Sequence, residues 1–100
     1  MIDVYLSRMD NGAHKDTPRE LRRISDFKLW LAETKGLSPH VSSDAVSRVR
    51  RASCWVDCGS GEPDDLLLLY LNRAPAFRAL SPSVRSQIRR AVSLYREFQT

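Results

Sequence analysis

Seven arginines gather in two segments of this sequence, and their side chains are suited to binding phosphate groups. The first set is Arg48, Arg50 and Arg51, and the second is Arg85, Arg89, Arg90 and Arg96. A guanidinium group offers donors in a planar fork that pairs bidentately with phosphate or with guanine. The last twenty residues carry a net charge of +3, within a total of +4 for the chain. Such a local positive charge is typical of nucleic-acid-binding surfaces, and a solvated charged face is the alternative interpretation.

Each arginine set follows a Ser-Pro dipeptide that is typical of a helix start. Helix N-termini present unbonded backbone N–H groups to anions, and serine hydroxyls near them can bind phosphate. The expected DNA contacts are therefore the seven arginines together with Ser38, His40 and Ser81. The Trp and Phe residues fall on faces expected to be buried, which leaves no aromatic platform for stacking single-stranded bases. We therefore expect duplex DNA as the partner.

The two cysteines, Cys54 and Cys58, have a spacing that zinc sites permit. A structural zinc site needs four ligands, however, and the other candidates are two distant histidines, His14 and His40. A cysteine beside an apolar helix face behaves as a small hydrophobic residue. We therefore expect no metal and no other cofactor.

Motifs that support catalysis are missing from the sequence. The segment over residues 59–61 has two glycines but lacks the later glycine and the lysine of a phosphate-binding loop. The sequence contains neither a Gly-x-Ser-x-Gly motif nor a pair of histidines at helical spacing. Tyr70 and Tyr95 carry hydroxyls that can act as nucleophiles, but Tyr95 falls on an apolar helix stripe. We therefore expect a binding protein and not an enzyme.

Four helices are expected to position these residues, and the first two have clear start signals. The first runs from Pro18, with Thr17 as its N-cap, to Lys35. The second runs from Pro39 to about Asp57, where a Gly-rich loop begins. Its expected core face comprises Val41, Ala45, Val49, Ala52 and Val56.

The third and fourth helices are expected in the second half of the chain. Asp64 and Asp65 suit the positive N-terminal end of a helix that contains the Leu-rich residues 66–71. Residues 72–79 are expected to form a linker, and the fourth helix begins at Pro82. The apolar stripe of that helix comprises Val84, Ile88, Ala91, Val92, Tyr95 and Phe98.

These elements predict an all-α protein with a single helical domain over residues 17–100, preceded by a flexible lead-in over residues 1–16. The chain length of 100 residues is ordinary for one domain. The longest apolar run, residues 66–71, is far shorter than a membrane span, and charged residues interrupt the first ten residues. We therefore expect a cytoplasmic protein with no membrane partner, and its oligomeric state stays open.

The order of several short motifs resembles the N-terminal core-binding domain of phage integrases and other tyrosine recombinases. The motifs are Trp30-Leu31, Gly36-Leu37-Ser38-Pro39, Leu66 to Leu71, Leu80-Ser81-Pro82 and Tyr95-Arg96-Glu97-Phe98. The resemblance covers about residues 21–99. It implies a small four-helix orthogonal bundle of the SAM-like kind, which clamps one side of duplex DNA through its second and fourth helices.

The sequence departs from that family in two ways. The threonine that commonly follows Ser-Pro-x is replaced by Val41 in the second helix and by Val84 in the fourth, which removes a phosphate contact from each. The chain also ends before a catalytic domain would begin. The resemblance therefore implies a DNA-binding domain without recombination chemistry, with a recombinase or another protein as a second partner.

Two alternatives stay open at the level of sequence. Residues 31–51 also resemble a repressor-type helix-turn-helix, in which Ala32 and Gly36 have the usual spacing. The valine of that motif stands one residue early, at Val41, and Ser42 takes its place. The other alternative is a protein-interaction module built on the same helical fold.

Overall fold

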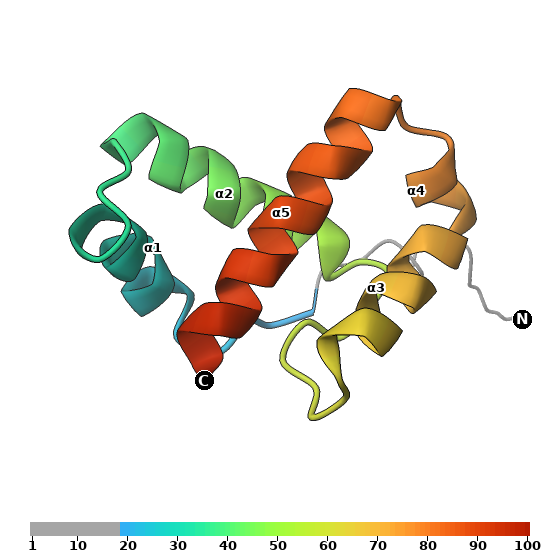
Figure 1. Ribbon diagram of the computed structural model, residues 1–100, viewed down its shortest axis with the longest axis horizontal. Coiled ribbons are helices and arrows are strands. Elements are labelled where there is room, and N and C mark those ends of the chain that lie inside the picture. Colours follow the sequence, from blue (N-terminus) through green and yellow to red (C-terminus); the bar gives the residue numbers. More distant parts are fainter. Residues whose placement is uncertain (1–18) are drawn as a thin grey trace, which may run out of the picture.

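The computed structural model describes residues 19–100 and folds them into five helices. These are α1 (Ile24–Glu33), α2 (Pro39–Ala52), α3 (Asp64–Arg73), α4 (Pro75–Arg78) and α5 (Pro82–Gln99), as Figure 1 shows. Residues 19–100 contain no strand, which confirms the all-α prediction. The expected lead-in over residues 1–16 lies outside the described residues. The bundle has one helix more than expected, because a single turn, α4, separates α3 from α5.

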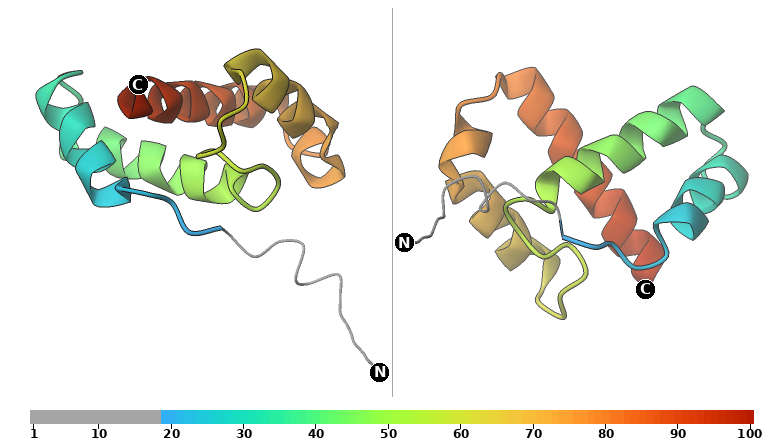
Figure 2. Two further views of the ribbon diagram at one scale, coloured as in Figure 1. Left: turned by 90° about the horizontal axis from the view of Figure 1, so that it is seen from below. Right: turned by 180° about the vertical axis from the view of Figure 1, so that it is seen from behind.

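The core forms where α5 lies across α2. Figure 1 shows α5 in front of α2, and the view from below in Figure 2 shows the two helices as separate layers, with α1 on one side of the pair and α3 and α4 on the other. Large apolar side chains with at most 1 % exposure come from all five helices; they are Phe27, Leu31, Val49, Leu71, Phe77, Ile88, Val92 and Tyr95. The stripe predicted for the last helix is therefore confirmed as a core face.

The two Ser-Pro helix starts are confirmed as N-caps. The hydroxyl oxygen of Ser38 accepts the backbone N–H of Val41 at 3.2 Å. Ser81 accepts the N–H of Val84 in the same way at 3.3 Å. A serine in this position satisfies one of the N–H groups that lack a partner in the first turn. The two long helices therefore begin where the sequence predicted.

The predicted start of the first helix is wrong within the described residues. Pro18 lies outside them, but residues 19–23 are not helical, and α1 begins only at Ile24. Arg23 has a φ of 55°, a left-handed conformation that interrupts a right-handed helix. Arg19 Nη1 donates to the Ser53 carbonyl at 2.7 Å, which holds residues 19–23 against the end of α2. Tertiary contacts therefore override the local start signal.

The second helix is shorter than predicted and one of its core positions is open. It ends at Ala52, where the hydroxyl of the buried Ser53 donates to the Arg50 carbonyl at 2.5 Å. The chain continues to Val56 in tight turns and not as a helix. Val41 was expected in the core but is 43 % exposed, because the first turn of α2 projects beyond the part that α5 covers.

The linker predicted over residues 72–79 is also wrong. Its first two residues complete α3, and Pro75 begins α4, in which Phe77 is buried. Proline at the first helical position lacks only an N–H that would have no helical partner. Burial of Phe77 stabilises this single turn, which is too short to be stable by itself. No helix within residues 19–100 is long and apolar enough to cross a membrane.

Candidate functional site

The N-terminal half of α5 lies between two other elements. Figure 1 shows α2 on one side of it and α4, with the end of α3, on the other. Residues 66–96, which include most of α3, all of α4 and most of α5, contain six arginines and no Asp or Glu. This side of the molecule therefore has few carboxylates that could neutralise its guanidinium groups.

A groove between α2 and α5 brings together one arginine from each helix. Arg48 of α2 and Arg90 of α5 line it together with Gln87. Its volume is about 130 Å³, and its apolar floor comprises Leu37, Val41, Ala45, Ala91 and Leu94. Within residues 19–100, neither arginine side chain has a hydrogen-bond or ion-pair partner. Within the described residues, the groove therefore presents two guanidinium charges without an internal counterion.

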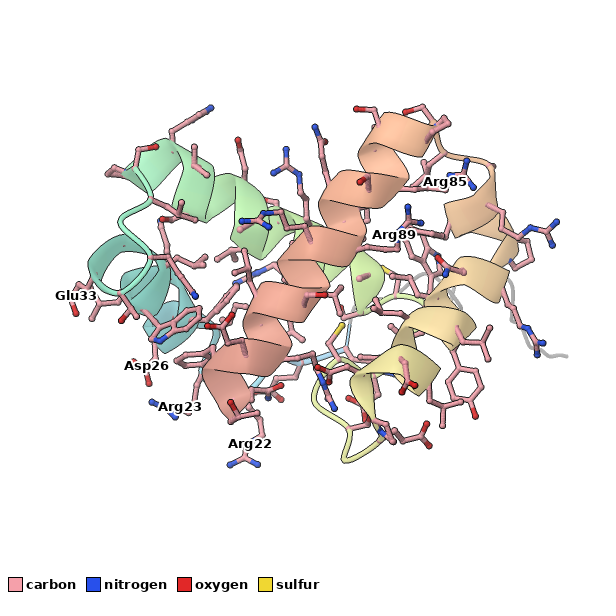
Figure 3. The ribbon with its side chains drawn as sticks, viewed as in Figure 1. Arg22, Arg23, Asp26, Glu33, Arg85 and Arg89 are labelled. Carbon is pink, nitrogen blue, oxygen red and sulfur yellow. The ribbon has the colours of Figure 1, made fainter. Side chains whose placement is uncertain are left out.

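A second pair of arginines lies on the opposite flank of α5. Figure 3 shows Arg85 and Arg89 on the same side of the helix, both directed towards α4. Arg89 Nη1 donates to Asn72 Oδ1 at 3.2 Å, and its Cζ lies 5.9 Å from the centre of the Phe77 ring. Arg85 Nε is buried and has no acceptor in the described part of the chain. Neighbouring side chains therefore hold the guanidinium of Arg89 in place without neutralising it.

Arg96 does not belong to this surface, which corrects the sequence prediction. Its Nε lies 2.9 Å from Asp64 Oδ1, and its Nη1 donates to the carbonyls of Cys58 at 2.9 Å and of Ser60 at 2.6 Å. Its Nη2 donates to the carbonyl of Glu62. The side chain is only 12 % exposed. Arg96 therefore fastens the loop before α3 to α5 and has no donor fork available for DNA.

The remaining predicted contacts are spread over the α2 side of the molecule. Arg50 lines a separate hollow with Arg19 and Glu20, next to the start of α1. Arg51 is exposed at the last turn of α2. His40 is 87 % exposed, and its Nε2 lies 3.6 Å from Asp44 Oδ2. The structure thus joins Arg48 with Arg90, and Arg85 with Arg89, but does not bring all the predicted residues into one site.

Cys58 and Tyr95, two of the side chains considered for reactivity in the sequence, are both buried. Burial, reinforced by the charge of Asp57, raises the pKa of the Cys58 thiol from 9.0 to about 11, so the thiol stays protonated at neutral pH. Burial also raises the pKa of Tyr95, whose hydroxyl donates to the Arg22 carbonyl at 2.7 Å. No group of three or more metal-ligating side chains occurs within residues 19–100.

Sequence reasoning missed three residues that shape the arginine surface. Gln87 lies in the groove, while Asn72 and Phe77 hold Arg89. Gln87 lies between Arg85 and Arg89 in the sequence and could have been selected from its place on the helix. Asn72 and Phe77 were assigned to a linker, so their contacts with α5 could not be predicted.

No protein-family model, curated protein or solved structure matches this chain.

Proposed function

We propose that this protein is a non-enzymatic domain that binds duplex DNA through α2 and the N-terminal half of α5. The observation that carries the proposal is the α2–α5 groove, where Arg48 and Arg90 meet without a carboxylate partner in the described residues. Guanidinium groups that lack internal partners bind phosphate without first breaking an ion pair. The long stretch without acidic residues extends this positive surface along α5.

The placement of the aromatic residues favours a duplex over a single strand. Phe27, Trp30, Tyr95 and Phe98 pack against one another, with ring centres between 5.1 and 6.3 Å apart. Proteins that bind single strands stack bases on exposed aromatic side chains next to a basic groove. In this protein the basic groove is lined by aliphatic residues and glutamine instead. Contacts with the phosphate backbone of a duplex suit such a surface better.

The resemblance to the core-binding domain of tyrosine recombinases supports the same proposal. That family contacts DNA through its second and fourth helices, which correspond here to α2 and α5. We therefore propose a SAM-like DNA-binding domain that acts in the cytoplasm of a bacterium or on phage DNA, with a recombinase as a further protein partner.

A titration with fluorescently labelled duplex DNA tests the proposal. At about 50 mM salt the wild-type protein is expected to bind, and its affinity should fall steeply as salt is added because bound phosphates release counterions. The double variant Arg48→Gln/Arg90→Gln should bind at least about tenfold more weakly. Arg22→Gln is the matched control. Arg22 precedes α1 and lies near the C-terminal end of α5, far from the groove, with its side chain directed away from that helix (Figure 3). Absence of wild-type binding at low salt would contradict the proposal.

A hollow between α1 and α2 favours the protein-interaction module as the second candidate function. Its volume is about 450 Å³, and Leu29, Ala32 and Pro39 contribute to its walls. Leu29 is 55 % exposed, so its side chain is accessible to a partner in this hollow. If the protein is an interaction module, Leu29→Glu should abolish binding to its protein partner and leave DNA binding unchanged.

A further inference from the structure

We infer that the DNA backbone crosses over α5, from the α2–α5 groove on one flank to the Arg85–Arg89 pair on the other. The inference rests on the proposed function and adds the direction of the bound polyanion. It starts from the separation of the two arginine pairs, which lie on opposite sides of one helix and face different elements.

The helix itself keeps the two arginine pairs apart. An α-helix with its side chains is about 10–12 Å across, so one phosphate group cannot contact both flanks. A polyanion that lies along a single flank would contact one pair and leave the other exposed to solvent. Simultaneous contact with Arg85 and Arg48 therefore requires several linked phosphates. These would pass over the solvent-exposed face of α5 that separates the two flanks, here called the exposed ridge.

The exposed ridge between the two flanks suits a close approach of the backbone. The serines at positions 83, 86 and 93 are exposed on this side of the helix, next to Arg90. Their side chains are short, and their hydroxyls can donate hydrogen bonds to phosphate oxygens. The first acidic residue of α5 is Glu97, near the C-terminal end of the helix. Both the shape and the charge of the ridge therefore favour a crossing over its N-terminal half.

The guanidinium groups of Arg85 and Arg89 can bind an anion in addition to packing against α4. The bond from Arg89 to Asn72 uses one Nη donor, and no carboxylate within residues 19–100 pairs with its positive charge. Arg85 is partly exposed and has no hydrogen-bond or ion-pair partner in the described chain. Arg85 Nε itself is buried, so a phosphate would have to bind through the exposed part of the Arg85 guanidinium group, whose charge favours such a contact.

The salt dependence of duplex binding tests this second contact. For duplex DNA, the slope of log affinity against log salt falls by about 0.9 for each phosphate contact that is lost. Arg85→Gln/Arg89→Gln should therefore reduce the steepness of the slope by about 1–2 relative to wild type. Arg22→Gln should leave the slope unchanged. The single variant Arg85→Gln provides a second measurement, because it keeps the contacts of Arg89 with Asn72 and Phe77 and should still lower the slope by about 1.

A carboxylate on the ridge tests the crossing itself. Ser86→Glu places a negative charge between the two arginine pairs and should weaken duplex binding at least about tenfold at low salt. The matched control is Ser25→Glu on α1, an exposed serine near the start of a different helix, which should leave binding unchanged. Circular dichroism establishes that both variants keep the wild-type helix content.

The outcomes separate the inference from the proposed function. If the wild type does not bind duplex DNA, the proposed function fails and the inference fails with it. If the wild type binds and Arg48→Gln/Arg90→Gln lowers the slope, the proposed function stands. An unchanged slope for Arg85→Gln/Arg89→Gln, or equal effects of Ser86→Glu and Ser25→Glu, would then overturn the crossing alone. Inorganic phosphate that competes as well as a duplex would also overturn it, because a single phosphate cannot span α5.

Discussion

At the C-terminal end of α5, Arg96 pairs with Asp64 and donates hydrogen bonds to three carbonyls of the preceding loop. In the N-terminal half of the same helix, Arg85 and Arg90 have no such partners within residues 19–100. The residue type and the helix are the same in both regions. The difference lies in the facing elements, because the start of α3 supplies a carboxylate and the loop before it supplies carbonyl oxygens, whereas α4 and the facing part of α2 supply few.

This comparison shows why spacing alone does not identify a binding surface. Arg85, Arg89 and Arg96 share one stripe of the helix, and their spacing predicts a single function. One end of that stripe instead stabilises the fold, while the other end retains charges that can bind a ligand. The same substitution should therefore affect stability at one end and DNA affinity at the other.

The largest expected effect is the loss of stability on replacing Arg96. Arg96→Met should lower the free energy of unfolding by about 3 kcal/mol, because it leaves part-buried carbonyls of the 58–62 loop without donors. Urea denaturation followed by circular dichroism measures this change. Arg90→Met is the matched substitution at the other end, and it should change stability by less than about 0.5 kcal/mol. Equal losses in the two variants would remove the distinction between the two ends.

A smaller effect is expected at the N-cap of α5. Ser81→Ala removes the acceptor of the Val84 N–H and should lower the free energy of unfolding by about 1 kcal/mol. Ser83→Ala, an exposed position in the first turn, is the control and should have almost no effect. Thermal denaturation of the three proteins provides the measurement. If Ser83→Ala were as destabilising as Ser81→Ala, the cap would not be the origin of the loss.

The smallest expected effect is the loss of stability at pH 9 that arises from Cys58, next to the Arg96 contacts. Burial raises the pKa of Cys58 from 9.0 to about 11, so the folded protein holds this proton more tightly than the unfolded chain does. The resulting stabilisation is complete below pH 9 and is lost as the pH rises through 11. It should already have decreased by about 0.5 kcal/mol at pH 9, measured against Cys58→Ala. Parallel pH profiles for the two proteins would show that Cys58 does not contribute.

Features set by neighbouring residues could be predicted from the sequence. The caps at Ser38 and Ser81 depend on the next three residues, and the buried stripe of α5 depends on helical periodicity. These interactions are formed within one helix or against one apolar face. The helix starts at Pro39 and Pro82 were therefore correct.

Features that depend on distant segments could not be predicted. The start of α1 is set by the bond from Arg19 to Ser53, and the role of Arg96 is set by carbonyls in another loop. The pairing of Arg48 with Arg90 requires the packing of α2 against α5, which no local pattern encodes. The sequence therefore predicted the arginines but not which of them share a surface.

Backbone amide chemical shifts, recorded by NMR while duplex DNA is added at about 50 mM salt, compare the two ends of α5 most directly. The changes are expected in the N-terminal half of α5 and around Arg48 in α2, whereas the amides near Arg96 should be unaffected. Changes centred on the C-terminal end of α5, or none at all, would contradict the assignment of Arg48, Arg85 and Arg90 to DNA binding.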